Sequence, residues 1–249
     1  MTLVDGEGRD SRPRVLPCAL LRRPVAPADL QRRGTYLLAG AAKLDGRRAD
    51  AVFTINAAEH ARRLQLGVGA FLDCAALETM GNLPVDVPVP LTALAAWERE
   101  NLRILPKGSA TSDRGLITRN VRPVVELHAV TAAGPLLRPL IRRLTPFLRA
   151  TQCVAVLRAR PRNLDDQLWE ADAAGIGVWL GGDDPIVLVK PDVYRPAAMT
   201  AGRWLFSEMI YDAWLNATHP TGRSSGPADH RVHTGSATAS PPAQGHLLG

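Results

Sequence analysis

Two polar side chains separated by one residue, Glu126 and His128, stand in a largely apolar stretch, residues 124–130. Such a stretch favours a β-strand, in which residues i and i+2 project from the same face. Asp113 lies at the entrance of a preceding predicted strand. A tight turn at 120–123 would bring Asp113 towards that face, so we expect the two carboxylates to converge.

Two carboxylates and one further polar group at a sheet edge form the kind of site that holds Mg²⁺ or Mn²⁺. We therefore expect Asp113 and Glu126 to be metal ligands. The metal would activate water and neutralise the charge of a phosphodiester. His128, or Lys107 from a nearby loop, would assist at the phosphate.

The same residues also fit a purely structural interpretation. Glu126 and His128 would then lie on the solvated face of an edge strand, and Asp113 would be an ordinary turn residue or helix cap. The side chains that this strand would give to the core are Val124, Val125, Leu127 and Ala129.

A second candidate feature is a run of arginines without any acidic residue. It consists of Arg138, Arg142, Arg143, Arg149, Arg158, Arg160 and Arg162. Arginine presents a planar fork that suits phosphate, so this run predicts salt-dependent binding of nucleic acid. The alternative is a solvated helix face whose long side chains cover apolar surface. The net charge of +6 fits a polyanionic partner, whereas the main explanation for the high share of arginine among the basic residues is a GC-rich genome that favours arginine codons.

The elements that must position these residues alternate along the chain. From residue 91 onward, apolar periodicity and turn residues predict the order α-β-β-α-β-α-β-β-α. One helix is expected at 136–151, with Pro146 as a source of a kink. Short buried strands that alternate with helices indicate an α/β fold with a mixed sheet flanked by helices. Before residue 91, Asp45-Gly46 between two apolar runs predicts a β-hairpin.

The expected organisation has four parts. A polar flexible arm covers 1–13, an N-terminal β-rich α+β region covers 14–90, and an α/β core domain covers 91–216. Residues 217–249 are rich in Pro, Gly, Ser and Thr and lack large apolar side chains, which predicts a disordered tail.

The pattern over about 91–195 resembles the PD-(D/E)xK restriction-endonuclease-like superfamily. In that family a hairpin carries Asp and then Glu-x-Lys, followed by a helix, a strand, a helix and a closing strand. The matching pieces here are Asp113, Glu126-Leu127-His128, the helix 136–151, the strand VAVLRA and the segment EADAAGIGVWL. Glu98 or Glu100 would correspond to an extra acidic residue that some members carry. The resemblance implies a restriction-endonuclease-like core and metal-dependent cleavage of nucleic acid.

This sequence departs from the family pattern at two positions. His128 stands where the family has lysine, and Ser112 rather than proline precedes Asp113. Lysine stabilises charge that develops at the scissile phosphate, which a neutral histidine does less well. Either His128 substitutes, or Lys107 reaches the site, or the site is inactive.

Other classes of function find no support in the sequence. There is no P-loop and no GxGxxG turn between a strand and a helix, so we expect no nucleotide cofactor. Cys18, Cys74 and Cys153 form no CxxC pair, which argues for free thiols in a reducing cytoplasm. No apolar run has the length of about 18 residues that a membrane helix needs.

Three functions therefore remain open. One is a divergent nuclease-like protein that binds nucleic acid, either active with Mg²⁺ or Mn²⁺ or inactive. The second is a non-catalytic subunit that binds a protein partner or a second copy of itself. This second function predicts an exposed apolar patch, most simply around the last helix, where Trp204 and Tyr211 share a face. The third is an enzyme that acts on an unrelated small molecule and shows no motif in this sequence.

Overall fold

The computed structural model describes residues 15–17, 35–181, 186–194 and 198–218 of the 249. They belong to one compact unit, Met1–His219. The arm expected at 1–13 and nearly all of the tail expected at 217–249 lie outside the described residues. The last helix, α6, spans Ala201–Thr218 and so runs two residues beyond the predicted end of the core.

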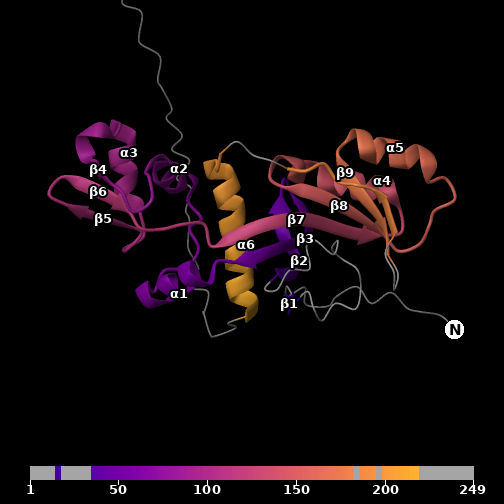
Figure 1. Cartoon of the computed structure of the whole chain (residues 1–249), viewed down its shortest axis with the longest axis horizontal. Coiled ribbons are helices and arrows are strands. Elements are labelled where there is room, and N and C mark those ends of the chain that lie inside the picture. The colour runs from indigo at the N-terminus through magenta and orange to yellow at the C-terminus, as the bar shows by residue number, and fades with distance from the viewer. Residues whose placement is uncertain (1–14, 18–34, 182–185, 195–197, 219–249) are drawn as a thin grey trace, which may run out of the picture. The chain divides into compact units, whose positions relative to one another are not determined.

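The main element is a mixed sheet in the order β1-β2-β3-β7-β8-β9-β10 (Figure 1). Pairing is antiparallel from β1 to β7, parallel from β7 through β8 to β9, and antiparallel again between β9 and β10. The strands are β1 Val15–Pro17, β2 Thr35–Leu44, β3 Arg47–Ile55, β7 Val125–Gly134, β8 Gln152–Leu157, β9 Ile176–Leu180 and β10 Ile186–Val189.

The hairpin predicted around Asp45-Gly46 is confirmed. Strands β2 and β3 pair antiparallel, and both turn residues have positive φ, 48° for Asp45 and 71° for Gly46. Asp-Gly suits a two-residue hairpin turn because Gly adopts positive φ without penalty and Asp tolerates it.

Helices pack against the sheet through a single apolar cluster. They are α4 Leu137–Leu144, which continues as the 3₁₀ turn η5 Thr145–Arg149, α5 Asp165–Ala173 and α6. Alternate residues of β8, namely Cys153, Ala155 and Leu157, join this cluster with side chains from all three helices. The predicted fold class, α/β with a mixed sheet flanked by helices, is confirmed. The α-helix ends just before Pro146, whose ring cannot continue the hydrogen-bond ladder.

The segment between β3 and β7 forms a smaller layer of its own. It contains a three-stranded antiparallel sheet in the order β4-β6-β5. Its elements are α1 Ala57–Leu66, α2 Cys74–Asn82, β4 Pro88–Pro90, η3 Leu91–Ala93, α3 Ala96–Asn101, η4 Leu102–Ile104, β5 Ala110–Asp113 and β6 Leu116–Arg119.

The strand pairing expected across residues 120–123 is wrong. Strand β6 pairs with β4 and β5, whereas β7 pairs with β3 and β8. The tight turn lies instead at Arg114-Gly115, where both residues have positive φ and glycine allows it. Strand β3 pairs with β7, so the region expected at 14–90 shares its main sheet with the region from 91 onward.

The buried guanidinium of Arg63 joins this smaller layer to α6. All five of its N–H groups donate hydrogen bonds. They reach the Glu59 carboxylate at 3.0 Å, the Glu208 carboxylate at 2.7 and 2.8 Å, and the carbonyl oxygens of Gly69 and Arg122. Arg63, Glu59 and Glu208 are at most 5% exposed.

The two carboxylates of this cluster have further donors. Glu208 accepts hydrogen bonds from the Phe71 backbone N–H and the Trp204 indole, and Glu59 accepts from Arg62. Burial alone would raise the pKa of Glu59, but the hydrogen bonds from Arg62 and Arg63 hold it below its usual value. The cluster therefore contributes stability at neutral pH that is lost as the pH falls through this lowered pKa.

Replacing Arg63 with leucine should destabilise the protein by about 3–5 kcal/mol, because Glu59 and Glu208 would stay buried without their cation. Urea unfolding followed by circular dichroism measures this. The matched control is Arg103→Leu, which removes the exposed ion pair with Glu100 and should cost under about 1 kcal/mol. Equal losses from both variants would contradict a special role for the buried cluster.

Candidate functional site

The structure separates the four residues predicted to act together. Asp113 is the exposed last residue of β5, at the tip of the small sheet, and Lys107 lies in the loop just before that strand. Glu126 and His128 lie on β7, in the main sheet. Figure 1 shows β5 and β6 beside α3, apart from β7. The turn that was to bring Asp113 to Glu126 is not formed.

Glu126 and His128 do meet at one side chain, Thr54 of β3. Glu126 lies directly opposite Thr54 in the register, and the His128 ring Nε2 is 3.2 Å from the Thr54 hydroxyl. The register shifts here, since Phe53 pairs with Leu127 but Val52 pairs with Ala129. His128 is thus the extra residue of a β-bulge, a feature that re-aims a side chain.

The burial pattern around Glu126 also agrees with the structural alternative, but the edge strand that it expected is wrong, because β7 lies between β3 and β8 in the main sheet. Glu126 is exposed and His128 is half-buried, while the four apolar neighbours expected in the core are buried. Those neighbours are Val124, Val125, Leu127 and Ala129. A solvated strand face and a functional site are compatible here, because the same exposure makes Glu126 available to a ligand.

The strand opposite β7 carries one carboxylate that the sequence analysis did not weigh, Asp50. It lies four residues from Thr54, which is roughly 13 Å along a strand. Burial raises the pKa of Asp50, against the opposing effects of the hydrogen bond from the Gly40 N–H at 2.8 Å and the charge of Arg143. Asp50 therefore does not share a cation with Glu126. The position opposite Glu126 holds a hydroxyl instead of a second carboxylate.

Within the described ranges, no group of three or more His, Cys, Asp or Glu side chains could hold a metal ion. The residues predicted as ligands do not fit a shared divalent cation, since Asp113 and Glu126 belong to different sheets.

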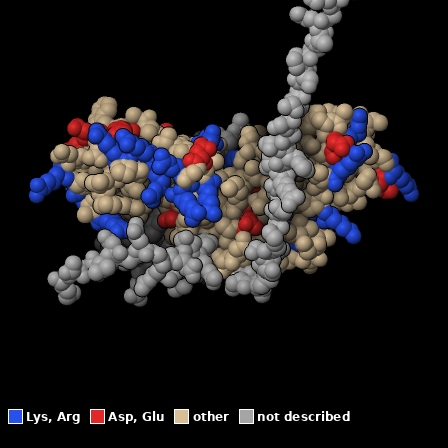
Figure 2. All heavy atoms as spheres, turned by 180° about the vertical axis from the view of Figure 1, so that it is seen from behind, with Lys and Arg blue, Asp and Glu red and all other residues tan. Residues whose placement is uncertain are grey.

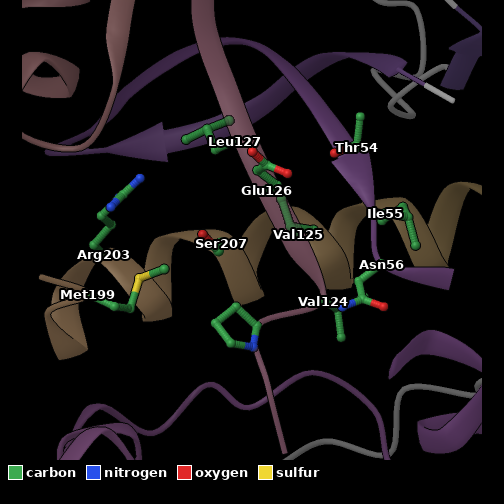
Figure 3. Close-up of a pocket in the computed structure, with 11 residues that line it drawn as sticks. Thr54, Ile55, Asn56, Val124, Val125, Glu126, Leu127, Met199, Arg203 and Ser207 are labelled. Atoms are coloured by element: carbon green, nitrogen blue, oxygen red, sulfur yellow. The ribbon is translucent and has the colours of Figure 1, made fainter. Parts of the chain in front are cut away.

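A pocket of about 390 Å³ opens beside Glu126 (Figure 3). It lies between the end of β3, the start of β7 and the first half of α6. Its lining residues are Thr54, Ile55, Asn56, Pro123, Val124, Val125, Glu126, Leu127, Met199, Arg203 and Ser207. Five of the eleven lining residues are polar, so the pocket is more polar than most small-molecule sites and offers several hydrogen-bonding groups.

Arg203 and Ser207 are pocket residues that the sequence analysis missed. They stand four residues apart on α6 and therefore share a helix face. The signal in the sequence that could have identified them is this polar pair at positions i and i+4 of a helix that is otherwise rich in aromatic residues. The aromatic side chains themselves, including Trp204 and Tyr211, are buried in the core.

The predicted arginines are all exposed around α4 and the segments that flank β8. Three of them form surface ion pairs: Arg138 with Glu170, Arg149 with Asp45, and Arg160 with Asp165. The other four, Arg142, Arg143, Arg158 and Arg162, form no ion pair with any described residue. Figure 2 shows a broad group of basic side chains on the side where α4, α5 and β7–β9 lie.

Comparison with models of protein families, with curated proteins and with solved structures finds no match to this chain. Among the described residues, no helix has the length and apolar character needed to cross a membrane.

Because the two carboxylates are apart, Mn²⁺ should show no binding that depends on both of them. Calorimetric titration of Mn²⁺ into the full chain tests this, with the Asp113→Asn, Glu126→Gln double variant beside the wild type. The two proteins should give the same heats. A binding isotherm that disappears in the double variant would restore the metal site.

Asp50→Asn should make the protein more stable at pH 7. The pKa of this carboxyl is higher in the folded than in the unfolded protein. The protonated carboxyl therefore adds to the stability of the folded state, and this contribution is lost as the pH rises through the folded-state pKa. Asparagine stays neutral and still accepts the Gly40 hydrogen bond. Urea unfolding between pH 4 and 7 should show a gain that grows with pH, while Asp113→Asn, at an exposed site, changes little. A loss of stability at pH 7 would contradict the assignment.

Proposed function

We propose that this protein binds nucleic acid through an arginine surface around α4, on a divergent nuclease-like fold without metal-dependent cleavage. This α4 arginine surface consists of Arg138, Arg142, Arg143 and Arg149, together with Arg47 and Arg48 at the start of β3. The observation that carries the proposal is that the exposed face of α4 holds basic residues and no acidic one.

The packing of α4 fixes these arginines on its outer side. Leu137, Leu140, Ile141 and Leu144 are buried against the sheet, so the basic residues between them must face solvent. The ion pair between Arg149 of η5 and Asp45, at 2.8 Å, brings the β2–β3 turn, and with it the start of β3, beside the end of this helix. A surface of this kind suits the spaced charges of a phosphate backbone.

The acidic partners near this surface are few and weakly held. The pairs of Arg138 and Arg149 are more than 40% exposed on both sides, and exposed pairs contribute about 0–1 kcal/mol. Phosphate groups can replace such partners at little cost. Arg142 and Arg143 form no ion pair with a described residue, and the Asp50 carboxylate acts on Arg143 only through its charge.

The order of elements supports the nuclease-like part of the proposal. Strand β7, with Glu126-Leu127-His128, follows β3 in the sheet and is followed along the chain by α4, β8, α5 and β9. This is the succession that the resemblance to the restriction-endonuclease-like superfamily implies, except that β3 takes the place beside β7 that was expected for the strand after Asp113. The residue opposite Glu126 is Thr54, which supplies a hydroxyl and not a second carboxylate. This favours binding of nucleic acid over its metal-dependent hydrolysis.

A second candidate function, a protein-binding subunit, has one specific observation in its favour. Trp169 on α5 is 81% exposed, and Ile186 and Val187 of the edge strand β10 are about half exposed. The aromatic residues of the last helix are buried, so these exposed side chains of α5 and β10 are the apolar surface that supports this second function. Exposed apolar side chains at a sheet edge suit a protein partner.

The Arg142→Gln, Arg143→Gln double variant should weaken binding of a short DNA duplex or single strand. Each phosphate contact contributes about 0.9 to the slope of log K against log salt, so the slope should fall by about 2. Fluorescence anisotropy of labelled nucleic acid over a series of KCl concentrations measures both quantities.

The matched control is the Arg103→Gln, Arg114→Gln double variant, which removes the same charge from exposed positions on the smaller layer. It should bind nearly as the wild type does. Equal losses in both variants would mean that net charge alone attracts nucleic acid, and no binding by the wild type would end the proposal.

A further inference from the structure

The pocket between β7 and α6 contains a hydroxyl that is available to a ligand. The Ser207 residue is 4% exposed and lines the pocket, and no described residue forms a hydrogen bond with its side chain. Figure 3 shows its oxygen directed away from the helix, into the space between Arg203 and β7. This oxygen is not among the fully buried side-chain atoms that lack a partner, so it is accessible from the pocket and can donate a hydrogen bond to a ligand there.

Arg203 supplies a positive charge on the same side of the pocket. Its guanidinium lies 5.2 Å from the centre of the Tyr194 ring, which orients the side chain without using its hydrogen-bond donors. No carboxylate of the described residues pairs with it. The arginine fork and the hydroxyl one helical turn away together suit a phosphate or another tetrahedral oxyanion.

The opposite side of the pocket has a different character. Figure 3 shows the Glu126 carboxylate on the side of Thr54, across the pocket from Arg203. A carboxylate there repels a second anion and accepts hydrogen bonds from hydroxyl or amino groups. Between the two ends, Val125, Leu127 and Met199 offer apolar surface. The site therefore fits a ligand with an anionic end and a neutral end that donates hydrogen bonds.

We propose that this pocket binds the phosphomonoester of a nucleotide, with Arg203 and Ser207 on the phosphate and Glu126 and Thr54 on the nucleoside. The volume of about 390 Å³ lies in the range of small-molecule sites. Two sources share this chemistry, a free mononucleotide and the phosphorylated end of a strand. The second source rests on the nucleic-acid binding proposed above, whereas the first does not.

The test compares three probes on the full-length protein: AMP, a short single strand with a terminal phosphate at the 5′ or 3′ end, and the same strand without it. Titrations by calorimetry or anisotropy give the affinities. A terminal phosphate should strengthen strand binding by about tenfold or more, as expected for charge-assisted hydrogen bonds. Ser207→Ala and Arg203→Gln should each abolish this preference and leave the affinity for the unphosphorylated strand unchanged.

Arg103→Gln serves as the matched control and should retain the preference. Two variants are used because Arg203 also contacts Tyr194, whereas Ser207→Ala removes a single oxygen. One outcome is that AMP binds, that its binding requires both Arg203 and Ser207, and that no strand binds. This would support the pocket as a mononucleotide site and contradict nucleic-acid binding by the α4 arginine surface. If strands bind without any phosphate preference and AMP does not bind, the pocket proposal is overturned and the arginine surface stands. Binding of AMP that both variants retain would also overturn it.

Discussion

The buried guanidinium of Arg63 holds the protein's two layers in a fixed relation. Its hydrogen bonds reach Glu208 on α6 and the carbonyl oxygen of Arg122, the residue just before the pocket wall that leads into β7. Glu208 follows Ser207 directly in the chain. One side chain thus links α6 to the segment that leads into β7, and both of these line the pocket. All five of the Arg63 donors are satisfied, so its contacts hold the two elements together without a further partner.

Local signals in the sequence predicted local structure well. Asp45-Gly46 predicted its hairpin because the turn chemistry lies within the two residues themselves, and the leucines and isoleucine of α4 revealed its buried face through helical spacing. Strand pairing between β3 and β7 could not be foreseen in the same way. Because the whole smaller layer lies between these strands in the chain, no local sequence pattern indicates that β3 is the neighbour of β7. This one error in pairing also misplaced Asp113 relative to Glu126.

The residues of the candidate site show the same contrast between local patterns, which the sequence reveals, and long-range contacts, which it does not. Glu126 and His128 were found from their spacing of two, and the structure brings both to Thr54. Arg203 and Ser207 were not found, because their significance depends on α6 crossing beside β7 rather than on any motif. What results is a site rich in hydrogen-bonding groups and poor in clustered carboxylates. Such a site suits recognition of a phosphorylated ligand better than activation of water by a metal, and the arginines of α4 suit recognition of the charged backbone.

The most direct test of nucleic-acid binding by the α4 arginine surface is to locate the contact itself. Ultraviolet cross-linking of the full chain to a short oligonucleotide, followed by mass spectrometry of the peptides, gives the residues that touch nucleic acid. We expect cross-links within residues 136–149 and at the β2–β3 turn. Cross-links confined to the smaller layer or to α5 and β10, or none at all under low salt, would contradict the assignment of this surface.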